Sequence, residues 1–264
     1  MRDNRRMPGA LSPAALAVLG ACVFLAGAVD ALAGGGGLIT LPAYLAAGLP
    51  PALALGTNKL SASIGTVAAI ARYRRDLKFS MREFLPVLGA AAAGAWLGAR
   101  AAVLVDPSWL RPLLLAMLPV VSWLVWSHRD FGHADSSGRL TKAQRRLRGM
   151  LTAGPIGLYD GFFGPGAGTF YALGFTRACG YDLVGATTRA KAVNLLSSGA
   201  ALFAFAAAGR VSWSVGLPMA VLSVAGNWVG AHFGARKGAA VIRPVVALVC
   251  AGLFAKLFFD MMSR

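Results

Sequence analysis

The chain has 264 residues, of which 57% are hydrophobic and 14% are charged, and its mean hydropathy is +0.63. Because a soluble domain has about 25% charged residues, this composition excludes an ordinary soluble domain and indicates an integral membrane protein. The formal net charge is +16, but the basic residues flank apolar runs instead of forming one continuous stripe, which argues against a nucleic-acid partner.

Long apolar runs predict eight membrane spans. A run of about 20 apolar residues can cross the hydrocarbon core of a bilayer. The predicted spans, in chain order, are 12–33, 52–71, 84–104, 110–127, 149–162, 190–208, 213–234 and 240–259. The segments 38–47 and 169–178 are apolar but too short to cross, so we expect half-helices or re-entrant segments there. The predicted class is therefore an all-α integral membrane protein.

The N-terminus has an alternative interpretation. The basic start MRDNRR, the apolar run that follows and ALA at 31–33 are typical of a secretory signal peptide with its cleavage site. We favour a membrane span, because the same region is repeated later in the chain, where no signal peptide could act.

An internal repeat divides the chain. Six features recur at an offset of 132 residues: Lys59 as Lys191, Pro86 as Pro218, Gly94 as Gly226, Trp96 as Trp228, Gly98 as Gly230, and the RP at 111–112 as the RP at 243–244. Three more recur at an offset of 130 residues: Asp30 as Asp160, Gly34 as Gly164 and Gly36 as Gly166. A shared offset over several spans indicates duplication. We predict a first four-span repeat over 1–127, a basic cytoplasmic loop over 128–148 and a second four-span repeat over 149–264.

The number of spans and the charge distribution predict how the repeats are oriented. Four spans return the chain to its starting side, so the two repeats should be parallel. Basic clusters within 2–6, 72–82 and 128–148 occupy every second gap between spans, as cytoplasmic segments do under the positive-inside rule. We therefore expect a multi-pass membrane protein with both termini in the cytoplasm.

Each half contains a glycine-rich break just after an acidic residue. AGGGGL at 33–38 follows Asp30, and GFFGPGAG at 161–168 follows Asp160. Matching glycine-broken segments in two halves are typical of transporter binding sites. A half-helix that starts at such a break directs N–H groups and partial positive charge into the membrane, which favours an anion. The predicted backbone ligands are Gly35, Gly36, Gly37, Gly164, Gly166 and Gly168. For Gly94, Gly98, Gly226 and Gly230, spaced as in GxxxG, we predict helix packing instead.

Charged and amide side chains follow each break, within or near the next span. They are Thr57, Asn58 and Lys59 in the first half and Arg189, Lys191 and Asn194 in the second. A Lys or Arg at the centre of a span costs about 2.5–3.5 kcal/mol, so it should face a cavity, a partner or a ligand, unless it snorkels to the interface. Three basic groups against two carboxylates favour an anionic substrate. Asp30 and Asp160 are predicted counter-charges, and whether they also carry protons is left open.

Other chemistries find no support in the sequence. The four glycines lack the Lys-Ser/Thr of a P-loop, and no catalytic dyad is present. The three cysteines and three histidines lack metal-ligand spacing, and the cysteines lie in or beside apolar runs. Ser61, Ser63, Ser197 and Ser198 are interpreted as hydrogen bonders between helices. We therefore expect no enzyme activity, cofactor or metal.

These motifs resemble a known family. The stretch AGGGGLITLPAYLAAGLPPALALGTNKLSASIGTVAAIARYRR at 33–75 resembles the signature of the TauE/SafE sulfite exporter family, also called the sulfonate uptake permease (TSUP) family. Segment 161–198 is similar to that family's repeat, and the likeness runs from about residue 14 to 258. The resemblance implies seven to nine spans and an anion site at Thr57, Asn58, Lys59, Arg189, Lys191 and Asn194. The second half departs from the pattern, because it has TTRAK where the first has GTNK.

The resulting functional hypothesis is a permease coupled to an ion gradient. The resemblance implies secondary transport of a sulfur-containing anion such as sulfite, sulfoacetate or another sulfonate in the bacterial cytoplasmic (inner) membrane. We expect alternating access. The alternatives are an anion channel, a permease for a non-sulfur organic anion, and a non-transporting component that binds a partner through 128–148. The expected partners are a small anionic substrate and membrane lipid, with a homo-oligomer left open.

Overall fold

The computed structural model describes residues 11–33, 35–73, 81–127 and 135–232, and these residues form helices and connecting loops without a β-strand. The helices are α1 (Pro13–Ala33), α2 (Gly37–Ala46), α3 (Pro51–Tyr73), α4 (Met81–Leu104), α5 (Pro107–Ser127), the short 3-10 helix η2 (Ser137–Arg139), α6 (Lys142–Phe162), α7 (Ala167–Cys179), α8 (Leu183–Ala207) and a last described helix, Trp213–His232. The predicted span 240–259, the basic cluster within 2–6 and Gly34 lie outside the described residues.

Four of the described helices are long and apolar enough to cross a membrane. These are Pro13–Ala31, Phe84–Leu104, Leu183–Ala207 and Trp213–His232. Four tryptophans near helix ends are exposed: Trp109 and Trp123 near the two ends of α5, and Trp213 and Trp228 near the two ends of helix 213–232. Exposed tryptophan at both ends is typical of the two membrane interfaces. The predicted all-α class is confirmed for the described part of the chain, whereas the count of eight spans is not.

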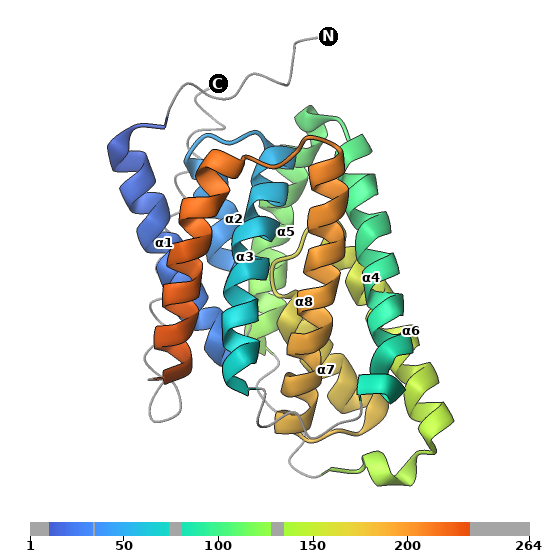
Figure 1. The fold of residues 1–264 in the computed structure, drawn as a ribbon. Helices are drawn as coiled ribbons and strands as arrows, with labels where there is room; N and C mark the ends of the chain where they lie inside the picture. Colours follow the sequence, from blue (N-terminus) through green and yellow to red (C-terminus); the bar gives the residue numbers. More distant parts are fainter. Residues whose placement is uncertain (1–10, 34, 74–80, 128–134, 233–264) are drawn as a thin grey trace.

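Both glycine-rich breaks are real interruptions between helices. Gly35 has a φ of +105°, and Gly164 and Gly166 have φ values of +98° and +78°. These left-handed conformations are accessible to glycine and strained for other residues, which explains why the chain breaks there. After each break the chain reverses, so α2 packs back along α1 and α7 packs back along α6 (Figure 1).

The two halves are antiparallel, not parallel as the number of spans predicted. On α3, Gly56 faces Phe205 and Lys59 contacts Ser198, so α3 and its counterpart α8 run in opposite directions. The reason is the short helix α2. It carries the chain back toward the end of the bundle where α1 begins, so α3 runs in the same direction as α1 (Figure 1). The first half therefore has an odd number of reversing segments, α1 to α5, and an odd number inverts the repeat that follows it.

This inversion also separates segments that were expected on one side of the membrane. α1 begins at one end of the bundle and α6 begins at the other (Figure 1). The predicted loop 128–148 is partly helical, because α6 already begins at Lys142. The helix that follows the N-terminal basic cluster and α6 thus start at opposite ends. This contradicts the expectation that both basic segments lead into the bundle from the cytoplasmic side.

The GxxxG glycines pack helices across the halves. A Cβ added at Gly94 would lie 2.2 Å from the carbonyl oxygen of Gly154, and one added at Gly98 would lie 2.0 Å from that of Leu158. The equivalent Gly226 and Gly230 meet the carbonyl oxygens of Phe24 and Ala28 at 2.0 and 2.3 Å. The packing role predicted for these glycines is what the structure shows: α4 lies on α6, and helix 213–232 lies on α1 in the same way.

Candidate functional site

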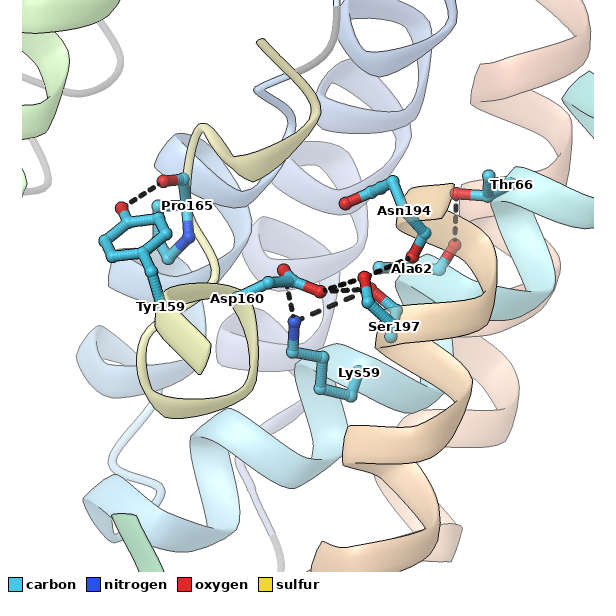
Figure 2. Close-up of polar contacts among 9 residues, drawn as sticks. Lys59, Ala62, Thr66, Tyr159, Asp160, Pro165, Asn194 and Ser197 are labelled. Atoms are coloured by element: carbon cyan, nitrogen blue, oxygen red, sulfur yellow. Dashed lines mark hydrogen bonds and ion pairs between the residues drawn. The ribbon is translucent and has the colours of Figure 1, made fainter. Parts of the chain in front are cut away.

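The two glycine-rich breaks meet inside the bundle. A Cβ added at Gly37, the first residue of α2, would lie 3.1 Å from the Cα of Pro165 in the second break. The hydroxyl of Tyr159 donates to the carbonyl oxygen of Pro165, which holds the second break against the last turn of α6 (Figure 2). The contact brings together two segments that are more than a hundred residues apart, at the boundary between the halves.

A buried ion pair lies beside this contact. The Nζ of Lys59 is 2.6 Å from Oδ1 of Asp160, and the two residues are 3% and 1% exposed. Lys59 comes from α3 of the first half, and Asp160 from the last turn of α6 in the second half. A Cβ added at Gly164 would lie 3.0 Å from the lysine Nζ, so the second break forms one wall of the pair.

Two serines of α8 complete the shell of the carboxylate. Ser197 Oγ donates to Oδ2 of Asp160 at 2.6 Å, and Ser198 Oγ donates to the same oxygen at 3.3 Å. Lys59 also donates to Ser198 at 3.5 Å. Figure 2 shows Lys59, Asp160 and Ser197 converging from three helices. Burying two charges is costly, and these hydrogen bonds are what makes such a buried pair tolerable.

Lys191 occupies the equivalent position in the other half but has different partners. Its Nζ donates to the carbonyl oxygen of Ala31 at 2.9 Å and to that of Asp30 at 3.4 Å. Each lysine therefore reaches the first helix of the opposite half, as the repeat requires. The predicted proximity of each lysine to an acidic residue is found, although the direct carboxylate contact is observed for Lys59.

Asp30 has a local role that the sequence interpretation did not include. Its Oδ1 accepts a hydrogen bond from the backbone N–H of Gly36 at 3.3 Å. The carboxylate therefore uses the hydrogen bond of an N–H group at the start of α2, a position where the helix dipole stabilises an acidic group. In this conformation the Gly36 N–H, predicted to face a substrate anion, faces Asp30 instead.

Arg189 does not join the Lys59 cluster. It lies in the second turn of α8, where its guanidinium is 3.9 Å from the centre of the Tyr181 ring and donates to the carbonyl oxygen of Gly185 at 3.0 Å. Burial raises the pKa of Tyr181, so the neutral ring presents its face to the cation. The predicted excess of three bases over two acids at one site is therefore not found, because Lys59 is neutralised by Asp160 and Arg189 lies elsewhere.

The remaining predicted ligands differ in their burial and in their hydrogen-bond partners. Thr57 Oγ1 accepts from the backbone N–H of Ser212, so Thr57 holds the turn before helix 213–232. Asn58 is buried, and its Oδ1 has no hydrogen-bond partner within the described part of the chain. Asn194 lies one turn before Ser197 on the same side of α8 (Figure 2). Gly35 and Gly166 are buried in the breaks, and Gly168 is half-buried in the first turn of α7.

Comparison with known proteins gives the family. The family model described as sulfite exporter TauE/SafE matches residues 19–257. This chain belongs to the TauE/SafE family. The curated relatives of this TauE/SafE chain include a probable membrane transporter protein ORF9 of Sinorhizobium sp, 38% identical over 93% of both chains. The family resemblance and the membrane-transporter class inferred from the sequence are thereby confirmed.

Two further relatives of this TauE/SafE protein have similar names. The probable membrane transporter protein YfcA of Escherichia coli (strain K12) is 37% identical over 95% of this chain and 92% of its own length. A probable membrane transporter protein of Haemophilus influenzae is 35% identical over 93% and 95%. No solved structure matches this chain.

One residue of this TauE/SafE site escaped the sequence analysis. Tyr171 of α7 is fully buried and lies near Asp160 and Ser197. Its hydroxyl approaches Ser197 but makes no hydrogen bond of ordinary length and angle with the residues described. A single tyrosine in an apolar segment gives no signal by itself. Its distance of five residues from Gly166, which caps the N-terminus of α7, could have placed it about one turn and a half into the half-helix. Ser197 and Ser198, interpreted as hydrogen bonders between helices, do connect α8 to α6.

Proposed function

We propose that this chain is a secondary transporter that moves a small sulfur-containing anion across the bacterial cytoplasmic membrane by alternating access, coupled to an ion gradient. Sulfite, sulfoacetate and other sulfonates are the proposed substrates. The transporter class follows from the family and its relatives. The sulfur-containing anion is proposed from the family description, and the coupling and the mechanism are proposed from the site.

The buried pair of Lys59 and Asp160 carries this proposal. An ammonium group deep in the bundle requires an anionic partner at all times, because an unpaired buried charge costs several kcal/mol. Asp160 is that partner in the present conformation. A substrate anion fits the same requirement during transport, and the breaks on either side of the pair supply backbone able to rearrange.

The inverted relation of the halves supports alternating access. Inverted repeats with binding sites at broken helices near the repeat interface are typical of secondary transporters. Here the pair joins α3 of one half to α6 of the other, so a movement of α3 relative to α6 changes the surroundings of both charges.

Flux measurements in proteoliposomes test the proposal. Purified protein is reconstituted, and uptake of labelled sulfite and sulfoacetate is measured with and without a pH gradient at a clamped membrane potential. We expect saturable uptake that responds to the proton gradient and is lost in Lys59→Met, whereas Gly89→Ala, at an unobstructed position of α4, retains it. Acetate and other carboxylates serve as competitors.

Other outcomes of the same assay contradict parts of the proposal. Competition by carboxylates but by no sulfur compound would indicate a permease for organic anions. A conductance that follows the membrane potential alone and does not respond to the pH gradient would indicate a channel.

A further inference from the structure

We propose that the carboxylate of Asp160 occupies the place of the substrate, and that Lys59, Ser197, Ser198 and Tyr171 are the ligands that a small oxyanion binds when Asp160 is protonated. This inference rests on the proposed function, because it assigns the residues and the coupling ion of that transport site. It adds three hydroxyl side chains to the site and gives Asp160 the role of an internal competitor.

The contacts of the carboxylate are those of a bound oxyanion. Oδ1 accepts a hydrogen bond from the ammonium group of Lys59 at 2.6 Å, and Oδ2 accepts hydrogen bonds from the hydroxyls of Ser197 and Ser198 at 2.6 and 3.3 Å. A charged donor and two hydroxyls around two oxygens of one group form a set that any XO2⁻ edge can accept, including an edge of a sulfite or sulfonate.

Tyr171 supplies a donor for a third oxygen. Its side chain is 0% exposed and it neighbours both Asp160 and Ser197. Its hydroxyl approaches Ser197 but makes no hydrogen bond of ordinary length and angle in the described part of the structure. A buried hydroxyl without a hydrogen bond costs about 1–3 kcal/mol, so it is normally retained for a purpose. A carboxylate has two oxygens and leaves Tyr171 unused, whereas a sulfite or sulfonate has three and can accept its proton.

Charge balance at this site then defines the coupling. Asp160 faces Lys59 from α3, Tyr171 from α7 and the two serines from α8, with Tyr159 beside it on α6. When a proton binds the Asp160 carboxylate, the acid becomes neutral and Lys59 loses its counter-charge. One sulfonate group restores the balance beside Lys59, so one proton accompanies each sulfonate group that binds there, and the proton leaves when the carboxylate returns to Lys59.

Asp30 is not the equivalent competitor in this conformation. Its carboxylate accepts from the Gly36 N–H, and the nearby Lys191 is held by main-chain carbonyl oxygens. The hydroxyl pattern also differs, because position 65, equivalent to Ser197, is a glycine, and Thr66, equivalent to Ser198, donates to Ala62 of its own helix (Figure 2).

The inference is tested by equilibrium binding of methanesulfonate and sulfoacetate to purified full-length protein at several pH values. Methanesulfonate stays ionised throughout, so any pH dependence belongs to the protein. For wild type we expect the affinity to rise as the pH falls, by up to about tenfold per pH unit, as linkage of one proton to one anion requires. Asp160→Asn should bind without this pH dependence and at least as tightly as wild type does at its most favourable pH.

Tyr171→Phe provides a second test that does not alter the buried charges. It removes only the hydroxyl, and we expect an affinity for methanesulfonate lower by about tenfold or more, because a hydrogen bond to a charged group is lost. The matched control is Tyr44→Phe. Tyr44 is also fully buried, but its hydroxyl donates to Ser61 at 2.9 Å and does not face Asp160, so binding should be unchanged.

The outcomes separate this inference from the proposed function. If neither probe binds wild-type protein at any pH, the proposed sulfonate substrate class is wrong, and this inference is wrong with it. If the probes bind with the same affinity at every pH, or Tyr171→Phe matches Tyr44→Phe, the transporter proposal stands and the ligand assignment is overturned. Loss of binding in Asp160→Asn with wild-type thermal stability would overturn the role of Asp160 as competitor.

Discussion

The ammonium group of Lys191 donates to the carbonyl oxygen of Ala31 at 2.9 Å, whereas Lys59, its equivalent in the first half, holds the carboxylate of Asp160 at 2.6 Å. Two lysines related by the repeat thus donate to main-chain oxygens in one case and to a carboxylate in the other. The difference means that the two positions respond differently to the same substitution, although the sequence makes them look interchangeable.

Removing the ammonium group at position 59 should destabilise the fold strongly. Lys59→Met leaves the Asp160 carboxylate buried and unpaired, which costs about 3–5 kcal/mol. Lys191→Met removes hydrogen bonds to main-chain oxygens and should cost less. The measurement is the free energy of unfolding in mixed micelles for both variants.

The double variant Lys59→Met/Asp160→Leu provides the control for this comparison. It replaces the pair by apolar groups, so most of the lost stability should return while transport remains absent. A double variant that is less stable than Lys59→Met would show that the pair is not the source of the cost.

Alanine at Gly98 should weaken the packing of α4 on α6. The added Cβ would lie 2.0 Å from the Leu158 carbonyl oxygen, a backbone atom that cannot move aside. Forced overpacking of this kind costs about 1–3 kcal/mol. Gly89→Ala on the same helix meets nothing within 4 Å and should be neutral or slightly stabilising, because alanine has the higher helix propensity. Thermal unfolding of the two purified variants measures the difference.

The second glycine-rich break should tolerate alanine poorly for two separable reasons. Gly164 has a φ of +98°, which costs an alanine about 1–2 kcal/mol, and a Cβ there would lie 3.0 Å from the Nζ of Lys59. Gly48 has a similar φ of +94° with nothing within 4 Å, so Gly48→Ala reports the strain alone. We expect both variants to lose comparable stability but only Gly164→Ala to lose transport. Equal transport in the two would show that the Gly164 wall does not affect Lys59.

Substitutions of Asp30 should separate helix capping from proton transfer. Asp30→Asn keeps an oxygen that can accept from the Gly36 N–H, so its stability and transport should stay near wild type. Asp30→Ala removes the acceptor and should cost about 0.5–2 kcal/mol, as for other capping residues. Transport and thermal unfolding are measured for both variants. Loss of transport in Asp30→Asn, with stability intact, would instead assign a titrating role to this carboxylate.

The antiparallel halves predict opposite labelling of two positions. Ser12 precedes α1 and Ser136 precedes η2 and α6, so cysteines placed there should lie on opposite sides of the membrane. Because the basic residues around 142–148 favour the cytoplasm, Ser12→Cys should react with an impermeant thiol reagent in intact cells and Ser136→Cys should react only after permeabilisation. Cys22, Cys179 and Cys250 are replaced first. Labelling of both cysteines from the same side would contradict the orientation.

The breaks and the buried lysines could be predicted because each has a strong local cause. A run of adjacent glycines destabilises a helix, so it indicates a break, and a lysine such as Lys59 in an apolar span requires a partner. The glycines at 94, 98, 226 and 230 were predictable for the same kind of reason, since their spacing places them on one helix face. These features depend on the nearest residues in sequence and on the membrane as solvent.

The rest depended on geometry that local patterns do not carry. α2 is too short to count as a span, yet it reverses the chain and changes the parity of the repeat. Arg189 and Lys191 are neighbours in sequence, but residues two apart on a helix do not share a face, which is why they lie in different surroundings. The hydrogen bond from the Gly36 N–H to Asp30 joins two residues that are six positions apart. It forms because the chain turns back between α1 and α2, and no sequence motif specified that turn.

The contacts made by Gly94, Gly98, Gly226 and Gly230 bear on which parts of the molecule can move as rigid bodies. At these crossings backbone lies on backbone, with no side chain between the helices that could shift to let one slide past the other. α4 is therefore fastened to α6, and helix 213–232 to α1, although each partner is encoded in the other half of the chain. Each group of helices that can move as a rigid body therefore contains helices from both halves of the chain. Dividing the chain at its midpoint would cut through both of these groups.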